Sequence, residues 1–224
     1  MSERFKAIAR QLGVAIYPPM CRTCLLIIRP GAVFCDACIV AIKPIVSKIF
    51  PVTRHYTLKV FAVTEYKEPL RDLVTKKFYG DVVATRQLAT LMTRFIPLRD
   101  MPIDYLVPVP LHWTRYAVRG YNQTYTMAKI LGEHCNTPVK RLLWRTRKTA
   151  FQWSLSAADR QENVKEAFGL HPWYQWQEMA FLEGKHIVLV DDLCTTGATL
   201  IQMAKALAPY KPASISAVVA CRAV

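Results

Sequence analysis

The stretch KHIVLVDDLCTTGATL, residues 185–200, decides the fold of this chain. Its first half contains Ile187 to Val190, a continuous aliphatic run of the kind found in a parallel strand that is buried on both faces. Two carboxylates follow, Asp191 and Asp192, and a turn of small residues then leads into IQMAKALAPY, whose apolar residues recur at helical spacing. The stretch therefore predicts a buried strand that ends in two aspartates and turns into a helix.

The turn between this strand and this helix has the features of a phosphate site. Free N–H groups at a helix N-terminus attract an anion, threonine hydroxyls add donors, and glycine lets the backbone approach closely. The expected phosphate ligands are Thr195, Thr196, Gly197, Ala198 and Thr199. Two carboxylates beside an anion suit a vicinal diol or hydrated Mg²⁺, and a ribose 5-phosphate offers a diol and a phosphate in this order. The alternative is a strand that turns through exposed aspartates into an ordinary threonine-capped helix.

The complete string closely resembles the binding signature for 5-phosphoribosyl-1-pyrophosphate (PRPP) in the type I phosphoribosyltransferases. The resemblance implies that Asp191 and Asp192 bind the ribose hydroxyls, with Mg²⁺ on the pyrophosphate, and that the turn binds the 5-phosphate. In that fold the pyrophosphate is displaced from the anomeric carbon through an oxocarbenium-like state. Purine-salvage members carry an aspartate as general acid or base where Thr195 stands, and pyrimidine members lack it. The resemblance implies a PRPP site and leaves the catalytic residues open.

Seven cysteines divide into two groups. Four of them form the pairs CRTC and CDAC, Cys21 with Cys24 and Cys35 with Cys38, and ten residues separate the pairs. Two such pairs can hold one Zn²⁺ through four thiolates, and a module of this size needs its metal to fold. Two disulfides are the alternative, which conflicts with the absence of a secretory signal in the first residues. The scattered cysteines are expected to be small buried residues: Cys135, Cys194 and Cys221.

The charge is strongly basic, at +14 with a pI near 9.6, which favours polyanionic partners. Cationic and aromatic residues alternate in the middle third of the chain, a composition that suits single-stranded nucleic acid because phosphates attract charge and unstacked bases stack on rings. The candidate nucleic-acid contacts are Lys140, Arg141, Trp144, Arg145, Arg147, Lys148 and Trp153. The alternative is that the aromatic side chains belong to the core and the cations to a solvated face.

The chain order predicts four regions. They are an N-terminal helix over residues 1–18, a four-cysteine zinc module over 19–40, a connector over 41–55, and a main domain over 56–224. The stretch IVAIKPIVSKIF, residues 39–50, which leads into the main domain, predicts a broken helix interrupted at Pro44. Strands and helices alternate in the main domain, which predicts an α/β fold: a mainly parallel sheet with helices on both faces. Because there is neither a secretory h-region nor a run of about 18 apolar residues, we expect a cytoplasmic protein. The basic surface could also contact the inner membrane peripherally through anionic lipid.

Further blocks extend the resemblance to nearly the whole chain, about residues 19–222. EYKEPLRDLVTKKFYGD, VPVPLHWTRYAVRGYNQ, RTRKTAFQWSLSAADRQENVKEAF and the terminal CRA look like successive blocks of the ComF family. Members of this family combine a four-cysteine zinc element with a phosphoribosyltransferase-like domain. The resemblance implies a pyrophosphate loop with Arg115 and Arg119, and a lid over residues 152–163 with Arg160.

The resemblance implies a role in natural transformation, in which incoming single-stranded DNA is taken from the inner-membrane channel. A helicase-like protein and recombination mediators would then be partners, together with PRPP or a related sugar phosphate. The alternative function is an active Mg²⁺-dependent phosphoribosyltransferase with a small acceptor. No insertion that would recognise an acceptor follows the aspartates, and this favours the DNA-handling role.

Overall fold

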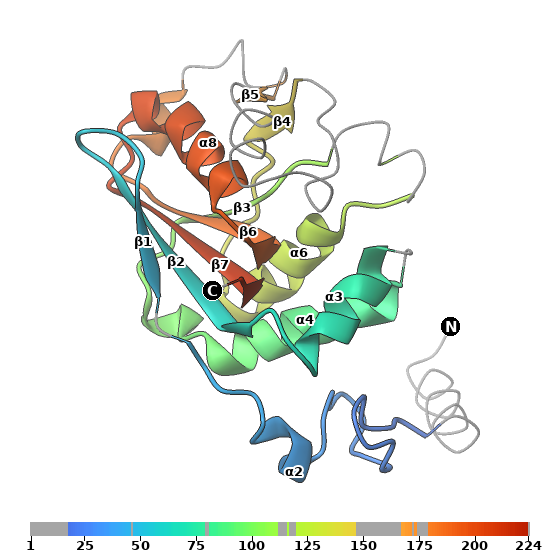
Figure 1. Ribbon diagram of the computed structural model, residues 1–224. Helices are drawn as coiled ribbons and strands as arrows, with labels where there is room; N and C mark the ends of the chain where they lie inside the picture. The colour runs from blue at the N-terminus through green and yellow to red at the C-terminus, as the bar shows by residue number, and fades with distance from the viewer. Residues whose placement is uncertain are drawn as a thin grey trace. The chain divides into compact units, whose positions relative to one another are not determined.

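In the computed structural model, the residues described are 18–45, 47–78, 81–111, 116, 120–146, 167–171, 173 and 179–223. The chain divides into two compact units, Met1–Lys43 and Pro44–Val224, here called the cysteine unit and the α/β unit. The described α-helices and strands of both units are labelled in Figure 1. In chain order they are α2 (Asp36–Ile39), β1 (Lys48–Pro51), β2 (Thr57–Glu65), α3 (Leu70–Phe78), α4 (Val82–Phe95), η1 (Leu98–Asp100), β3 (Tyr105–Pro108), α6 (Gln123–Cys135), β4 (Leu143–Arg145), β5 (Phe168–Leu170), η4 (Met179–Leu182), β6 (His186–Cys194), α8 (Ala198–Leu207), η5 (Ala208–Tyr210) and β7 (Ser214–Arg222).

A five-stranded sheet in the order β1-β2-β7-β6-β3 forms the centre of the α/β unit. The β2–β7, β7–β6 and β6–β3 pairs are parallel, and β1 alone runs antiparallel, beside β2. The aliphatic run from Ile187 to Val190 lies in β6, between β7 and β3, and all four of its side chains are fully buried. The predicted strand is therefore an inner strand, and the expected mainly parallel sheet is confirmed.

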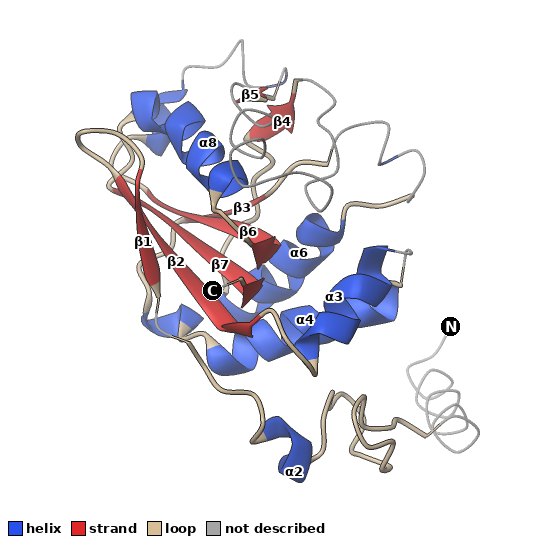
Figure 2. Ribbon diagram, viewed as in Figure 1, coloured by secondary structure: helices blue, strands red, loops and turns tan. Residues whose placement is uncertain are grey.

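Helices cover both faces of this sheet, as Figure 2 shows. On one face α8 buries Leu200, Met203 and Leu207 in a cluster with residues of β2, β6 and β7. On the other face α4 contacts β2 and β7, and α6 contacts β3 and β6. Their N-terminal caps are Asp81, which accepts the Ala84 N–H at 2.9 Å, and Asn122. The predicted arrangement of an α/β sheet between helices is confirmed.

The two edges of the sheet are closed differently. Beyond β3, the chain after α6 adds one bridge: the Leu106 N–H donates to the Pro138 carbonyl at 3.0 Å, and the Lys140 N–H donates to the Leu106 carbonyl at 2.9 Å. At the opposite edge, β1 joins β2 through a hairpin in which the Val52 N–H donates to the Tyr56 carbonyl. The sheet therefore ends in a single bridge on one side and a short strand on the other.

A carboxylate fastens the amino ends of β3 and β6 together. Asp104 accepts the His186 N–H at 2.8 Å and the Lys185 ammonium at 3.1 Å. The backbone hydrogen bond from His186, and then the charge and hydrogen bond of Lys185, hold the pKa of the Asp104 carboxyl below its usual value. The clasp lies at the end of β6 opposite to Asp191 and Asp192.

The segment predicted as a connector, 41–55, contains regular structure. Its residues 48–51 form β1, so the predicted broken helix is wrong there. Pairing with β2 decides the strand, because four residues cannot bury an apolar face on their own. The N-terminal helix predicted over 1–18 lies outside the described residues, apart from its last position. Among the helices described, none is long and apolar enough to span a bilayer.

Candidate functional site

The two aspartates lie at the carboxyl end of β6, the second-to-last strand of the parallel part of the sheet. The strand continues through both of them to Cys194, farther than the sequence pattern predicted, since Asp191 pairs with Val219 and Leu193 with Cys221. Both aspartates are half-buried, and Asp191 Oδ1 accepts the backbone N–H of Asp192 at 2.9 Å. Ligands of open α/β sheets bind beyond the carboxyl ends of strands, so the pair is well placed to receive one.

The predicted phosphate turn follows at once and opens α8. Gly197 is the N-cap of α8 and has no side chain to cap it, while the Ala198 N–H lies 3.4 Å from Thr196 Oγ1. Thr195, Thr196 and Thr199 are partly exposed. An uncapped helix start flanked by accessible hydroxyls offers hydrogen-bond donors to an anion. The structure thus brings the predicted diol and phosphate ligands to adjacent positions at one end of β6.

Gly197 is required for a reason that the sequence did not reveal. Its φ of +78° is left-handed, and a Cβ built on it would lie 2.9 Å from two ring carbons of Phe50. Phe50 belongs to β1, far away in sequence. The close approach at this glycine in the structure is therefore made by an aromatic ring of the edge strand, and that ring supports the turn.

The thiol of Cys194 lies beside the turn, in surroundings that disfavour its thiolate form. Burial raises the pKa of Cys194 to about 11, and the negative charge of Asp191 acts in the same direction. The positive charges of Arg222 and Lys48 and the Gly197 N–H oppose this rise without cancelling it. Cys194 and Cys221 are buried, as expected of small core residues, and Cys135 is partly buried.

Arg222 lies at the edge of the candidate site, and the sequence reasoning missed it. It ends β7, in register with Cys194 of β6 on one side and Glu65 of β2 on the other. Its Nε is buried, and no hydrogen-bond partner for it is found within the described part of the chain. The available signal was its place in CRA at the end of the last strand, because parallel strands end at the same edge. Arg222 brings a cation to the edge that carries the two aspartates.

The RGYNQ block, residues 119–123, is described from Gly120 onward and begins α6. Thr124 Oγ1 and Asn122 Nδ2 both donate to the Val109 carbonyl, at 2.6 and 3.2 Å, and Tyr121 hydrogen-bonds Thr85 of α4. These bonds fasten α6 to the carboxyl end of β3, next to β6. The candidate pyrophosphate and lid residues Arg115, Arg119 and Arg160 lie outside the described residues, as does the predicted lid over 152–163.

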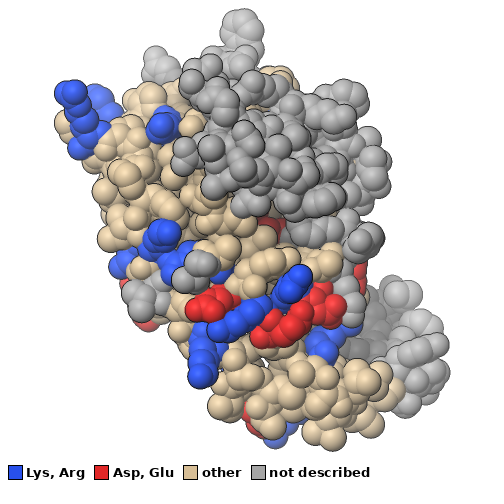
Figure 3. All heavy atoms as spheres, viewed as in Figure 1, with Lys and Arg blue, Asp and Glu red and all other residues tan. Residues whose placement is uncertain are grey.

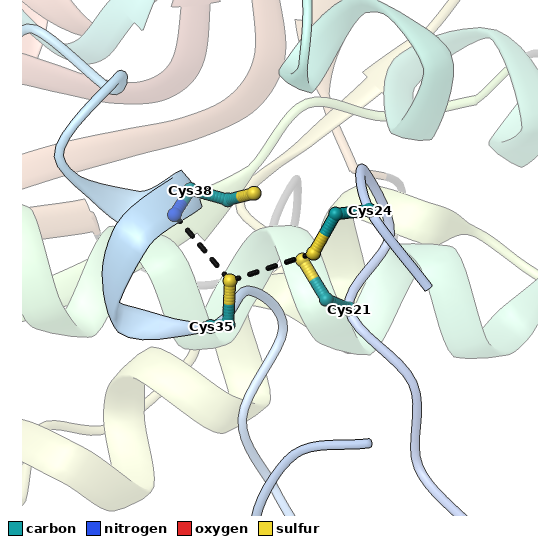
Figure 4. A group of neighbouring side chains, drawn as sticks. All are labelled: Cys21, Cys24, Cys35 and Cys38. Atoms are coloured by element: carbon teal, nitrogen blue, oxygen red, sulfur yellow. Dashed lines mark hydrogen bonds between the residues drawn. The ribbon is translucent and has the colours of Figure 1, made fainter. Parts of the chain in front are cut away.

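Four thiols converge in the cysteine unit, as Figure 4 shows. The Sγ atoms of Cys21, Cys24, Cys35 and Cys38 all lie within 4.8 Å of one another, and those of Cys24 and Cys35 are 3.6 Å apart. Four thiolates around one Zn²⁺ at about 2.3 Å would be separated by about 3.8 Å. The donor set and its spacing therefore fit a tetrahedral structural zinc.

The two cysteine pairs reach this cluster from different local structures. The first pair lies in a tight turn in which the Leu25 N–H donates to the Cys21 carbonyl and Leu25 is left-handed, with φ +61°. In the second pair, Cys35 is the N-cap of α2, and its sulfur accepts the Cys38 N–H at 3.4 Å. Each arrangement points both thiols of its pair to the same side.

The thiols differ in acidity. Burial of Cys21 opposes ionisation, but N–H groups of Cys24, Cys35 and Thr23 donate to its sulfur and lower its pKa to about 6. Hydrogen bonds to the side chains of Cys35 and Cys24 raise the pKa of Cys38 to about 12. The backbone thus favours one thiolate and the neighbouring thiols disfavour the last, an imbalance that a dication in the centre removes.

The candidate nucleic-acid residues are divided by the alternation of β4. Trp144 points outward and is 40% exposed, with its indole Nε1 3.5 Å from the position a Cβ would take on Gly169 of β5. Arg145 points inward, is only 8% exposed and places its guanidinium over the Phe168 ring, so its predicted contact with nucleic acid stays a prediction. The remaining candidates Arg147, Lys148 and Trp153 lie outside the described residues.

Two cations precede Trp144 in the chain. The Arg141 guanidinium lies 3.8 Å from the centroid of the Tyr125 ring, and the Lys140 ammonium lies 5.8 Å from that of Tyr105. Tyr125 therefore already has a cation on one face, which limits its use in base stacking. Trp173, not among the predicted contacts, is 72% exposed. The sequence analysis missed Trp173 because it lies outside the basic run in the middle third of the chain.

The sequence is similar to one protein family and to several named proteins. The profile of the family described as phosphoribosyl transferase domain matches residues 154–223. Competence protein F of Haemophilus influenzae is 32% identical over 158 residues, 66% of this chain and 66% of that protein. DNA utilization protein YhgH of Escherichia coli is 30% identical over 73% of this chain and 72% of that protein. Competence protein ComFC of Bacillus subtilis is 32% identical over 69% of this chain and 60% of that protein.

Proposed function

The chain belongs to the ComF family, and from that premise we propose that it is an accessory protein of natural transformation that binds incoming single-stranded DNA in the cytoplasm and carries a PRPP site. Relatives named for competence and for DNA utilization support the DNA role. The single observation that carries the DNA contact is Trp144, an indole beside Gly169 that is 40% exposed and follows Lys140 and Arg141 in the chain. Helicase-like and recombination-mediator proteins of transformation are the proposed protein partners.

The DNA contact would combine stacking with charge. Glycine at position 169 lets the Trp144 ring lie close to β5, so the ring is oriented before a base arrives. Stacking on one aromatic ring contributes about 1–3 kcal/mol per base and tolerates any sequence. Phosphates would contact Lys140 and Arg141, whose charged groups already lie over tyrosine rings.

The PRPP site would use the end of β6 and the start of α8. Asp191 and Asp192 would accept the ribose hydroxyls, and the residues from Thr195 to Thr199 would donate to the 5-phosphate. Mg²⁺ would neutralise the pyrophosphate, for which Arg222 brings additional positive charge to the same edge. The match to the phosphoribosyl transferase profile over residues 154–223 supports this assignment.

A DNA titration tests the first half of the proposal. We expect the chain to bind single-stranded oligonucleotides with an affinity that falls steeply with salt, by about 0.7 in log K per phosphate contact for each unit of log salt. Trp144→Ala should weaken binding about tenfold, whereas Ile49→Ala, an exposed change on β1, should leave it unchanged. Binding that is absent, insensitive to salt or equal in both variants would overturn the DNA contact.

A PRPP titration tests the second half. Calorimetry in the presence of Mg²⁺ should detect PRPP binding to the wild-type chain. The double variant Asp191→Asn/Asp192→Asn should lose this binding. The control variant Asp100→Asn, which changes an exposed carboxylate on η1, should keep it. Retention of the DNA affinity in the double variant would show that its fold is intact. Equal PRPP affinity in the wild type and the double variant would remove the aspartates from the site.

The second candidate function is a Mg²⁺-dependent phosphoribosyltransferase with a small acceptor. The intact pair of aspartates at the end of β6 favours it. This function requires that the chain releases pyrophosphate from PRPP when one specific base of a tested panel is added as the acceptor. The release should disappear in the variant in which both Asp191 and Asp192 are replaced by asparagine. If PRPP binds and no base of the panel causes release of pyrophosphate, the remaining role for PRPP is that of a ligand that regulates DNA binding.

A further inference from the structure

The cysteine unit exposes a group of aliphatic side chains. Met20, Leu25, Leu26 and Ile27 are 50, 66, 60 and 66% exposed, and they are here called the apolar tip. The four lie within eight residues of chain, and Met20 pairs with Ile27 in an antiparallel bridge, which places both arms of the turn side by side. Scattered exposed aliphatic residues are ordinary, but a contiguous group on so small a unit marks an interaction surface.

The backbone of the apolar tip is already hydrogen-bonded. The Cys21 N–H donates to the Leu26 carbonyl at 2.8 Å, the Leu25 N–H to the Cys21 carbonyl at 3.0 Å, and the Ile28 N–H to the Pro19 carbonyl at 2.9 Å. A hydrocarbon environment offers no partners to polar backbone groups, so a segment that enters it has to satisfy these groups internally. The tip meets much of this requirement without rearranging.

The side chains of the tip favour a lipid bilayer over another protein as its binding partner. Protein interfaces concentrate their binding energy in tryptophan, tyrosine and arginine, and leucine is under-represented there. The tip consists of leucine, isoleucine and methionine, and the first two are among the side chains that transfer best into a bilayer. Short aliphatic tips also enter the boundary between headgroups and acyl chains without spanning the membrane.

The charges around the tip favour anionic lipid. Arg22 and Arg29 flank the apolar residues, and the described part of the unit, residues 18–43, carries three cations, Arg22, Arg29 and Lys43, against one acid, Asp36. On the face that Figure 3 shows, most of the described surface of this unit, at the bottom of the view, is neither acidic nor basic. The whole chain has a net charge of +14, which attracts it to a negatively charged surface over a longer range.

We infer that the apolar tip inserts into the headgroup region of an anionic bilayer and makes the cysteine unit a peripheral membrane anchor. The cysteine cluster fixes the tip at its base, since Cys21 and Cys24 belong to the same turn. A fixed tip loses little conformational entropy on insertion. The inference does not depend on the proposed DNA or PRPP sites, which lie in the other unit.

Vesicle flotation of the full, zinc-loaded chain tests the inference. With phosphatidylcholine vesicles that contain phosphatidylglycerol, we expect the chain to float with the lipid, and to float much less with phosphatidylcholine alone. The variant Leu25→Ser/Leu26→Ser/Ile27→Ser should lower the partition coefficient at least tenfold. The matched control Ile49→Ser/Val82→Ser/Val83→Ser removes three exposed aliphatic side chains from the α/β unit and should float like the wild type.

Further measurements keep the test decisive. One zinc per chain in the tip variant shows that its cysteine cluster still forms. Leu26→Trp keeps an apolar side chain and adds a ring that prefers the membrane interface, so it should float at least as well as the wild type. Wild-type chain that stays with the soluble fraction, or a tip variant that floats equally well, overturns the inference. Concentration-dependent self-association that the tip variant loses, without flotation of the wild type, would assign the tip to a second copy instead.

Discussion

The two units of this chain use their aliphatic residues in opposite ways. In the α/β unit they fill a core on each face of the sheet, and Leu58, Ile187 and Leu189 are fully buried. In the described part of the cysteine unit the buried apolar residues are Cys21, Val33, Phe34 and Ile42, while Leu25, Leu26 and Ile27 point to solvent. A unit whose shape is fixed by a metal can leave its apolar side chains free for a partner. A unit held by its core cannot.

Removal of the metal should produce the largest effect and should separate the two units. Structural zinc contributes an apparent binding free energy of about 10–16 kcal/mol in small zinc domains. We expect Cys24→Ser to lose zinc and the hydrogen-exchange protection of the Cys21 and Leu25 amides, while the α/β unit keeps its unfolding temperature. Cys135→Ser, outside the cluster, should keep its zinc. A simultaneous loss of protection in β6 would show that the units do not fold independently.

Matched leucine truncations should sharpen the contrast. Leu58→Ala removes a fully buried side chain and should lower the free energy of unfolding by about 3 kcal/mol, because it leaves a cavity. Leu26→Ala removes the same atoms from an exposed position and should change it by less than about 0.5 kcal/mol. Urea denaturation followed by tryptophan fluorescence and circular dichroism measures both. Equal effects would contradict the division of roles.

The Gly197 turn should be the next most sensitive position in the α/β unit. Gly197→Ala forces a Cβ into a left-handed conformation and against the Phe50 ring, for an expected loss of about 2 kcal/mol. In a double-mutant cycle with Phe50→Leu, part of the loss should disappear because the ring is gone, and the backbone strain should remain. Additive effects would mean that the ring and the turn are not coupled.

The Asp104 clasp should contribute least and should depend on pH. Because the folded pKa of Asp104 lies below its unfolded value, its stabilisation is fully present above the unfolded pKa and is lost as the pH falls through the folded pKa. We expect Asp104→Asn to cost about 1 kcal/mol at pH 7, a modest value because the carboxylate is partly exposed. The difference from wild type should shrink below about pH 4. A difference that is constant from pH 7 to pH 3 would contradict this assignment.

Local patterns predicted most of the α/β unit, and contacts between distant segments explain what they missed. The aliphatic run of β6, the aspartates and the start of α8 lie next to one another in sequence, so periodicity and turn chemistry were enough to find them. Strand β1 was missed because it exists only through pairing with β2. For the same reason, no local signal could connect Phe50 with Gly197.

The basic run in the middle of the chain shows the limit of composition as a signal. Its nucleic-acid contacts were predicted from composition alone, although a short strand places alternate residues on opposite faces. Trp144 points outward, and its neighbour Arg145 points into the core. Strand periodicity, applied to Leu143, Trp144 and Arg145, predicts that Trp144 and Arg145 lie on opposite faces of the strand. The cysteine spacing, in contrast, needed no such correction, because the four predicted thiols do converge.

The closed edges of the sheet also bear on how the protein avoids aggregation at high concentration. An open strand edge is a template on which another chain can add a strand, the first step toward fibrous aggregates. The bridge from Leu106 to residues 138–140 occupies the middle of β3, and β1 is a strand of four residues that ends in a proline without an N–H and begins with a lysine. Neither edge offers a long run of unpaired groups, so crowded copies of this chain have little opportunity to polymerise through their sheets.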